Sequence, residues 1–76
     1  MKIEEFIQSF ADQFDDTEAS VLTPETNFRE LEEWTSLMGL AIMAMVDDEY
    51  SVQIKADDLR GCKTIQELFD LVNSKL

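Results

Sequence analysis

The fold is decided by one apolar stretch, Ser36-Leu37-Met38-Gly39-Leu40-Ala41-Ile42-Met43-Ala44-Met45-Val46. It predicts a helix that begins at Thr35 or Ser36 and ends at about Tyr50, and it is too short to cross a bilayer, so no membrane insertion is expected. A helix in so small a protein cannot be surrounded, so part of its apolar surface should be exposed for a partner. We expect Ile42, Met43, Val46 and Tyr50 to face the core, and Leu37, Met38, Leu40, Ala41 and Ala44 to form a second surface.

Two further helices flank this stretch. The first is predicted from residue 3, where apolar residues recur at helical spacing until the pattern fades at Asp15. The last is predicted from Thr64, which forms a capping-box pattern with Glu67 ahead of more apolar residues at helical spacing. Residues 56–60 allow at most a short helical turn before Gly61. The sequence therefore predicts an all-α protein with three main helices and one short helix.

Residues 15–34 form a long connection between the first two helices. They contain the only proline, within a predicted turn at Thr23-Pro24-Glu25-Thr26. So long a loop without structure is uncommon in a compact domain. We expect Leu22, Phe28 and Leu31 to hold it against the core, and we expect residues 1–76 to form a single domain.

The composition excludes several classes of function. The chain has 17 Asp and Glu against 6 Lys and Arg, a formal net charge of −11, which repels nucleic acids and favours basic protein surfaces. It has no histidine, so the commonest general base and metal ligand is missing and we expect no metal site. The single cysteine, Cys62, permits no internal disulfide and is expected in the core. A lone thiol and an N-terminus without a long apolar run favour the cytoplasm.

Ser36 is the polar residue of interest at the start of the apolar helix. Serine at such a position is most often an N-cap. It is also a suitable modification site, because a phosphodiester there would be favoured by free backbone amides and the positive end of the helix dipole. A nucleophilic role would require a nearby base, and only Lys2, Lys55, Lys63 and Lys75 are available, none in a recognisable motif. We therefore expect no catalytic residues.

The stretch Glu33-Trp34-Thr35-Ser36-Leu37, followed by the apolar helix and Asp47-Asp48-Glu49-Tyr50, resembles the signature of the acyl carrier protein family. The resemblance extends over the chain, through Phe28, Leu31, Ile54 and Thr64-Ile65-Gln66. It implies an acyl-carrier-like four-helix bundle with a long loop between its first two helices. It also implies that a phosphopantetheinyl transferase attaches 4'-phosphopantetheine from coenzyme A to Ser36, where acyl groups are held as thioesters. The implied protein is a freestanding cytoplasmic monomer without catalytic residues.

Two departures from the family pattern bear on partners. Thr35 replaces the usual aspartate, which predicts an adapted or slower transferase. Apolar residues replace the usual acids on the first half of the second helix, which predicts a specialised pathway. The implied partner surface has an apolar centre and an acidic rim, and its partners would be the transferase and acyl-transferring, ketosynthase or ligase enzymes. Its expected residues are Leu37, Met38, Leu40, Ala41, Asp47 and Asp48.

Two alternatives stay open. One is an acidic helical interaction module that is never modified, which the replacement of the usual aspartate by Thr35 favours. The other is a stand-alone aminoacyl or peptidyl carrier. The net charge of −11 favours an acyl or aminoacyl carrier over a peptidyl one, and fatty-acid, polyketide or related specialised biosynthesis are the pathways that the resemblance implies.

Overall fold

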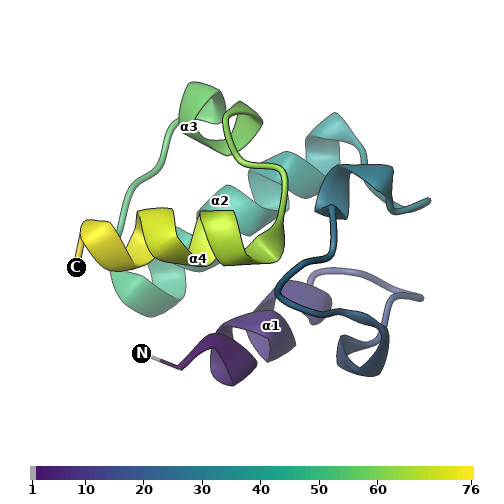
Figure 1. Ribbon diagram of the computed structural model, residues 1–76. Coiled ribbons are helices and arrows are strands. Elements are labelled where there is room, and N and C mark those ends of the chain that lie inside the picture. Colours follow the sequence, from purple (N-terminus) through teal and green to yellow (C-terminus); the bar gives the residue numbers. More distant parts are fainter. Residues whose placement is uncertain (1) are drawn as a thin grey trace.

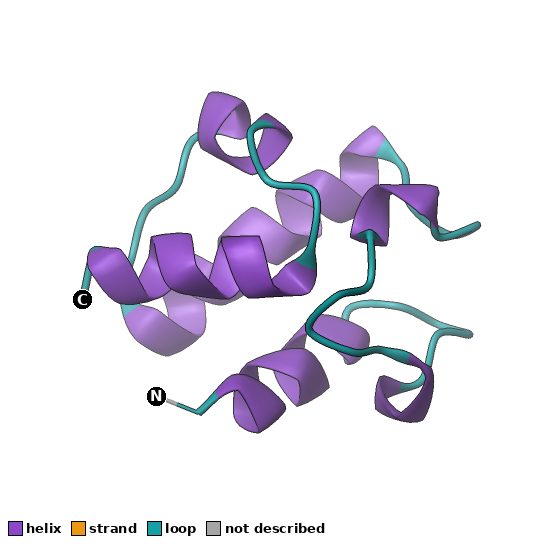
Figure 2. Ribbon diagram, viewed as in Figure 1, coloured by secondary structure: helices purple, strands orange, loops and turns teal. Residues whose placement is uncertain are grey.

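A computed structural model describes residues 2–76 as helices joined by loops, with no strand in that range (Figures 1 and 2). Helix α1 packs against both α2 and α4, and the short helix α3 packs against α2. The prediction of an all-α bundle with three main helices and one short helix is confirmed. The elements are α1 (Ile3–Ala11), the 3₁₀ turns η1 (Ala19–Val21) and η2 (Phe28–Glu30), α2 (Ser36–Tyr50), α3 (Ala56–Arg60) and α4 (Ile65–Ser74).

The core is built from the apolar faces of α1, α2 and α4, together with side chains from the loops. Phe28 of η2 is fully buried, Leu22 is buried, and the half-buried Leu31 packs against the cluster, so the long loop is held to the core as predicted. Val52 and Ile54, which precede α3, are also buried. The largest fully buried side chains are Phe6, Phe10, Phe28, Ile42, Val46, Ile65, Leu68 and Val72.

The long loop also contacts the start of α4 through its backbone. The predicted turn is present, with the Thr26 amide donating to the Thr23 carbonyl at 3.0 Å. Just beyond it, the Gln66 amide donates to the Pro24 carbonyl at 2.9 Å and the Ile65 amide donates to the Thr26 carbonyl at 3.2 Å. These amides lie in the first turn of α4, where no intrahelical acceptor exists. The loop therefore completes the hydrogen bonding of a helix that is distant in sequence.

Helix α2 is buried over a wider arc than its periodicity predicts. Ile42 and Val46 are fully buried, and Met43 and Tyr50 are half-buried against the core, as expected. Gly39 and Met45 are buried as well, because α1 and α3 pack on either side of the helix. On the outer surface Leu37, Leu40 and Ala44 are exposed, whereas Met38 and Ala41 are half-buried.

Helix α2 ends at Tyr50, as predicted. Ser51 follows in the left-handed conformation with φ of 56°, and its amide donates to the Asp47 carbonyl at 3.0 Å. Among the residues of known placement, it is the one non-glycine with positive φ. None of the helices in residues 2–76 is long and apolar enough to cross a membrane.

Candidate functional site

The first turn of α2 is capped by Thr35. Its backbone is extended, and its Oγ1 atom accepts a hydrogen bond from the Met38 amide at 3.2 Å. Its carbonyl accepts from the Gly39 amide at 3.0 Å. An N-cap residue lies outside the helical backbone conformation, and Ser36 lies inside it. The interpretation of Ser36 as the cap is therefore wrong, and the threonine that replaces the usual aspartate performs that role.

Ser36 is thus free of a structural role. Its side chain is exposed, and no hydrogen bond of the hydroxyl is found among residues 2–76. The amides of Ser36 and Leu37 also lack a partner within those residues, as expected for the first turn of a helix. The site therefore offers a hydroxyl and two backbone donors together at the positive end of the helix dipole.

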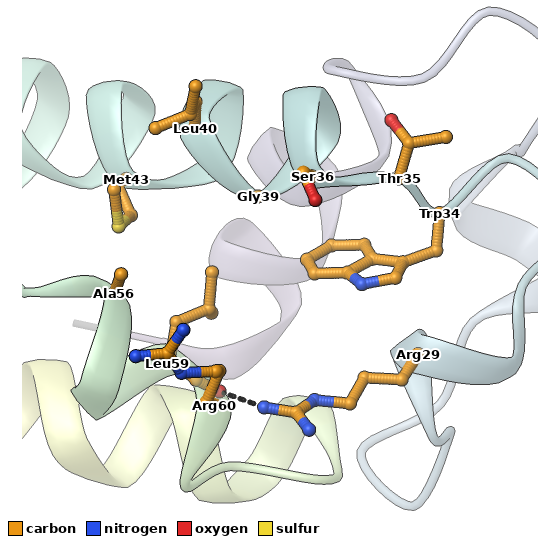
Figure 3. A pocket seen from close by; sticks show the side chains of 10 residues that line it. All are labelled: Arg29, Trp34, Thr35, Ser36, Gly39, Leu40, Met43, Ala56, Leu59 and Arg60. Carbon is orange, nitrogen blue, oxygen red and sulfur yellow. Dashed lines mark hydrogen bonds between the residues drawn. The ribbon is translucent and has the colours of Figure 1, made fainter.

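A groove of about 660 Å³ opens beside Ser36, between α2 and α3. Figure 3 shows the Ser36 hydroxyl pointing from α2 toward the ring of Trp34. The Trp34 ring is held by Phe28, with ring centroids 4.9 Å apart, and by Phe14 at 6.5 Å. Trp34 is therefore a packing residue at the junction of loop and helix, as well as one wall of the groove. The lining residues are Arg29, Trp34, Thr35, Ser36, Gly39, Leu40, Met43, Ala56, Leu59 and Arg60.

Two arginines line the groove and bring positive charge to it. Arg29 extends from η2, and its Nη2 atom donates to the carbonyl oxygen of Leu59 in α3 at 3.0 Å (Figure 3). Arg60 pairs with Asp57 on the same helix. No sequence motif indicates a role for either arginine. Arg29 and Leu59 are 30 positions apart, so no local pattern could have revealed their contact.

Glu33 fixes the segment that leads into the site. Its carboxylate accepts hydrogen bonds from the Asp15 and Asp16 amides at 3.2 and 3.1 Å and from the Thr17 hydroxyl at 2.6 Å. The Thr17 hydroxyl, and to a smaller extent these amides, hold the pKa of Glu33 below its ordinary value. In the sequence, Glu33 stands out only as the first residue of the stretch that resembles the family signature, and its partners come from a distant part of the chain.

The expected partner residues occupy two parts of α2. Leu37 and Leu40 are 75% and 57% exposed at the end that carries Ser36, and Leu40 also borders the groove. Asp47 and Asp48 are exposed near the other end, and with Ala41 they line a second hollow, which Gln13 borders just after the end of α1.

Cys62 lies in the core, as expected. Its side chain is 6% exposed, and its thiol donates to the Asp58 carbonyl at 3.4 Å. Burial raises the pKa of the Cys62 thiol.

The acidic residues next to Cys62 are engaged in local structure, since Asp58 accepts from the Lys55 amide and Asp57 pairs with Arg60. No group of three or more potential metal ligands is found within residues 2–76.

The comparison with protein families agrees with this geometry. Residues 4–72 match the family described as the phosphopantetheine attachment site. This match spans most of the 76 residues, and the chain belongs to that family of carrier domains. Its cofactor is covalently attached 4'-phosphopantetheine, and domains of this family are carriers rather than catalysts. No individual curated protein matches the sequence at a significant level.

Proposed function

We propose that the protein is an acyl carrier protein whose 4'-phosphopantetheine is attached to the hydroxyl of Ser36. The main support for this proposal is that Thr35 caps α2. The Ser36 hydroxyl is therefore exposed and has no hydrogen-bond partner in the described chain. A serine needed for capping would be costly to modify, whereas this one can be esterified without loss of a hydrogen bond of the fold. We infer that the carrier serves fatty-acid, polyketide or related specialised biosynthesis.

The residues around Ser36 suit a covalently attached 4'-phosphopantetheine. A phosphodiester on the hydroxyl would lie beside the amides of Ser36 and Leu37, at a helix end that favours negative charge. The groove offers an apolar wall in Trp34 and a cation in Arg29. When attached, the arm supplies a terminal thiol that holds an acyl group as a thioester. The protein's own residues hold the attachment point and present it to other proteins.

We further propose the outer face of α2 as the docking surface for partner enzymes. Leu37 and Leu40 are large exposed apolar side chains, and Met38 and Ala41 contribute their half-exposed edges. Asp47 and Asp48 add negative charge at the far end, where acids oppose the helix dipole and so do not serve stability. This surface suits a partner with an apolar centre and a basic rim. The partners would be a phosphopantetheinyl transferase and acyl-transferring, ketosynthase or ligase enzymes, and the carrier would act as a cytoplasmic monomer.

The direct test is intact-mass spectrometry after incubation with coenzyme A and a panel of phosphopantetheinyl transferases. We expect a mass gain of one phosphopantetheinyl group in the unmodified sequence and in Ser20→Ala, which removes another exposed serine. We expect no gain in Ser36→Ala. Because the Ser36 hydroxyl makes no hydrogen bond among residues 2–76, Ser36→Ala should keep its helical circular-dichroism spectrum and its unfolding midpoint.

Two outcomes would contradict the proposal. A mass gain that persists in Ser36→Ala would place the arm elsewhere. No gain with any transferase, while an ordinary acyl carrier protein is modified in parallel, would favour the unmodified interaction module. If the arm attaches, the ligase or transferase that subsequently loads it distinguishes an acyl carrier from an aminoacyl carrier.

A further inference from the structure

The groove beside Ser36 differs in charge from the rest of the molecule. The chain has 6 basic residues against 17 acidic ones, yet both side chains with full charges that line this groove, Arg29 and Arg60, are positive. The other walls are mainly apolar, from Trp34, Leu40, Met43, Ala56 and Leu59. A groove with apolar walls and a cation suits a ligand that combines a short carbon chain with an anionic group.

The two arginines are engaged in different ways. Arg60 is already paired with the Asp57 carboxylate. Arg29 donates instead to the neutral Leu59 carbonyl, and no carboxylate pairs with it within residues 2–76. A guanidinium has five N–H donors, so one hydrogen bond to a carbonyl leaves four donors and the full charge available. Arg29 is therefore the cation that can receive an anion in the groove.

The depth of the groove is limited where Trp34 and Leu59 approach Gly39. A Cβ atom placed on Gly39 would lie 3.3 Å from Leu59 Cδ2 and 3.6 Å from Trp34 Cζ2. The two side chains thus meet the helix backbone at the one position without a side chain. Trp34 is held from behind by Phe28, and Leu59 is buried. A long alkyl chain could pass this point only if packed side chains moved, which favours a short cargo.

We propose that the groove is a specificity site for a short acyl cargo that ends in a carboxylate, with Arg29 as the receptor for that carboxylate. This inference rests on Ser36 as the attachment position. Guanidinium groups bind carboxylates through paired hydrogen bonds. The side chain of Arg29 is exposed, so the interaction is screened by salt and discriminates between cargoes rather than immobilising one. The arm's own phosphodiester is a second anion that could reach Arg29, and the experiment separates the two.

The test compares four forms of the protein by nuclear magnetic resonance: unmodified, carrying the arm with a free thiol, carrying a pentanoyl group, and carrying a glutaryl group. Pentanoyl and glutaryl have equal carbon counts and differ in the terminal carboxylate. Amide-linked analogues avoid loss of the thioester. The observed signals are the Arg29 Nε–H, the Trp34 indole N–H and the Gly39 amide. We expect glutaryl to shift the Arg29 signal by about twice as much as pentanoyl or more, and the excess to vanish at about 0.5 M salt.

Matched variants separate charge from structure. Arg29→Gln keeps a donor for the Leu59 carbonyl and removes the charge, so the Gly39 and Trp34 signals should no longer distinguish glutaryl from pentanoyl. Lys75→Gln changes the net charge equally at the far end of α4 and should keep the difference. If Arg29→Gln disturbs α3, the salt titration of the unaltered sequence still decides the matter.

The possible failures are distinguishable. Intact mass is read first, and the absence of loading would contradict the proposed attachment and this inference together. Loading followed by equal shifts for pentanoyl and glutaryl would overturn this inference alone. A full shift of Arg29 already in the free-thiol form, with no increase for glutaryl, would identify the phosphodiester as its ligand and likewise overturn it. So would a difference between glutaryl and pentanoyl that persists in Arg29→Gln.

Discussion

Helices α2 and α4 both begin after a threonine cap, yet they differ in the hydrogen bonding of their first turn. Other residues of the protein accept hydrogen bonds from all the first-turn amides of α4, which makes its start closed, but not from all those of α2, whose start is open. At α4 the Thr64 hydroxyl accepts from the Glu67 amide at 3.1 Å, and the Glu67 carboxylate accepts from the Thr64 amide at 3.2 Å. The remaining first-turn amides, of Ile65 and Gln66, donate to carbonyls of the long loop. Every donor that the first turn leaves unsatisfied by the helix thus has a partner.

At α2 the same type of cap does less. The third helical position holds Met38 where α4 has Glu67, so no carboxylate reaches back to the Thr35 amide. The amides of Ser36 and Leu37 have no partner in the described part of the chain. Two features therefore make the difference: a glutamate at the third helical position, and a loop whose carbonyls accept from the amides at the helix start. The closed start contributes to the stability of the fold, whereas the open start leaves donors for the group that we propose on Ser36.

The largest loss of stability should come from removing the cap at the closed start of α4. Thr64→Ala removes the acceptor of the Glu67 amide and half of the capping box, so we expect the free energy of unfolding to fall by about 1–2 kcal/mol. Thr64→Ser keeps the hydroxyl and should retain most of that stability. Urea unfolding followed by circular dichroism measures both. Equal losses in the two variants would show that the methyl group, rather than the cap, is responsible.

A smaller loss is expected at the open start. Thr35→Ala removes one hydrogen bond, to the Met38 amide, and should lower the free energy of unfolding by about 0.5–1 kcal/mol. Thr35→Asp keeps a capping oxygen and adds a negative charge at the helix N-terminus, so stability should be unchanged or slightly higher. Urea unfolding of both variants checks this. A larger loss for Thr35→Ala than for Thr64→Ala would reverse the comparison.

Thr35→Asp also tests the departure from the family pattern. It restores the aspartate that the resemblance places before the modified serine, so we expect a general transferase to modify this variant a few-fold faster than the unaltered sequence. Rates of mass gain at limiting transferase measure the effect. An unchanged or slower rate would mean that Thr35 does not limit modification.

The smallest effect should be a pH dependence at the closed start. The backbone amides of Lys63 and Thr64 hold the pKa of Glu67 below its ordinary value of 4.5. Because the folded pKa is depressed, the stabilisation is complete above the unfolded pKa and is lost as the pH falls through the folded value. Glu67→Gln should therefore be less stable than the unaltered sequence at pH 7, with the difference closing below about pH 4.5. Urea unfolding at each pH measures this difference in the free energy of unfolding. A difference between Glu67→Gln and the unaltered sequence that stays constant from pH 7 to pH 3 would rule the prediction out.

The predictable features were those set by residues close together in sequence. The bounds of α2, the capping box of α4 and the burial of Leu22 and Phe28 follow from periodicity, local capping patterns and apolar punctuation of a loop. The contacts of Glu33 with residues 15–17 and of Arg29 with Leu59 join distant segments, and no local pattern specifies them. The assignment of the cap to Ser36 failed because adjacent Thr35 and Ser36 are equally suitable caps, and only the backbone conformation decides between them.

The position of Cys62 has a consequence for the chemistry of the arm. A carrier that holds acyl groups on a thiol would lose them to any reactive thiolate of its own through thioester exchange, in which the acyl group moves to the attacking sulfur and the arm leaves as its thiolate. Cys62 is 6% exposed and its pKa is raised by burial, so little thiolate is present to attack. In the modified protein the only accessible thiol would be that of the arm, and a thiol-directed label would therefore report loading directly.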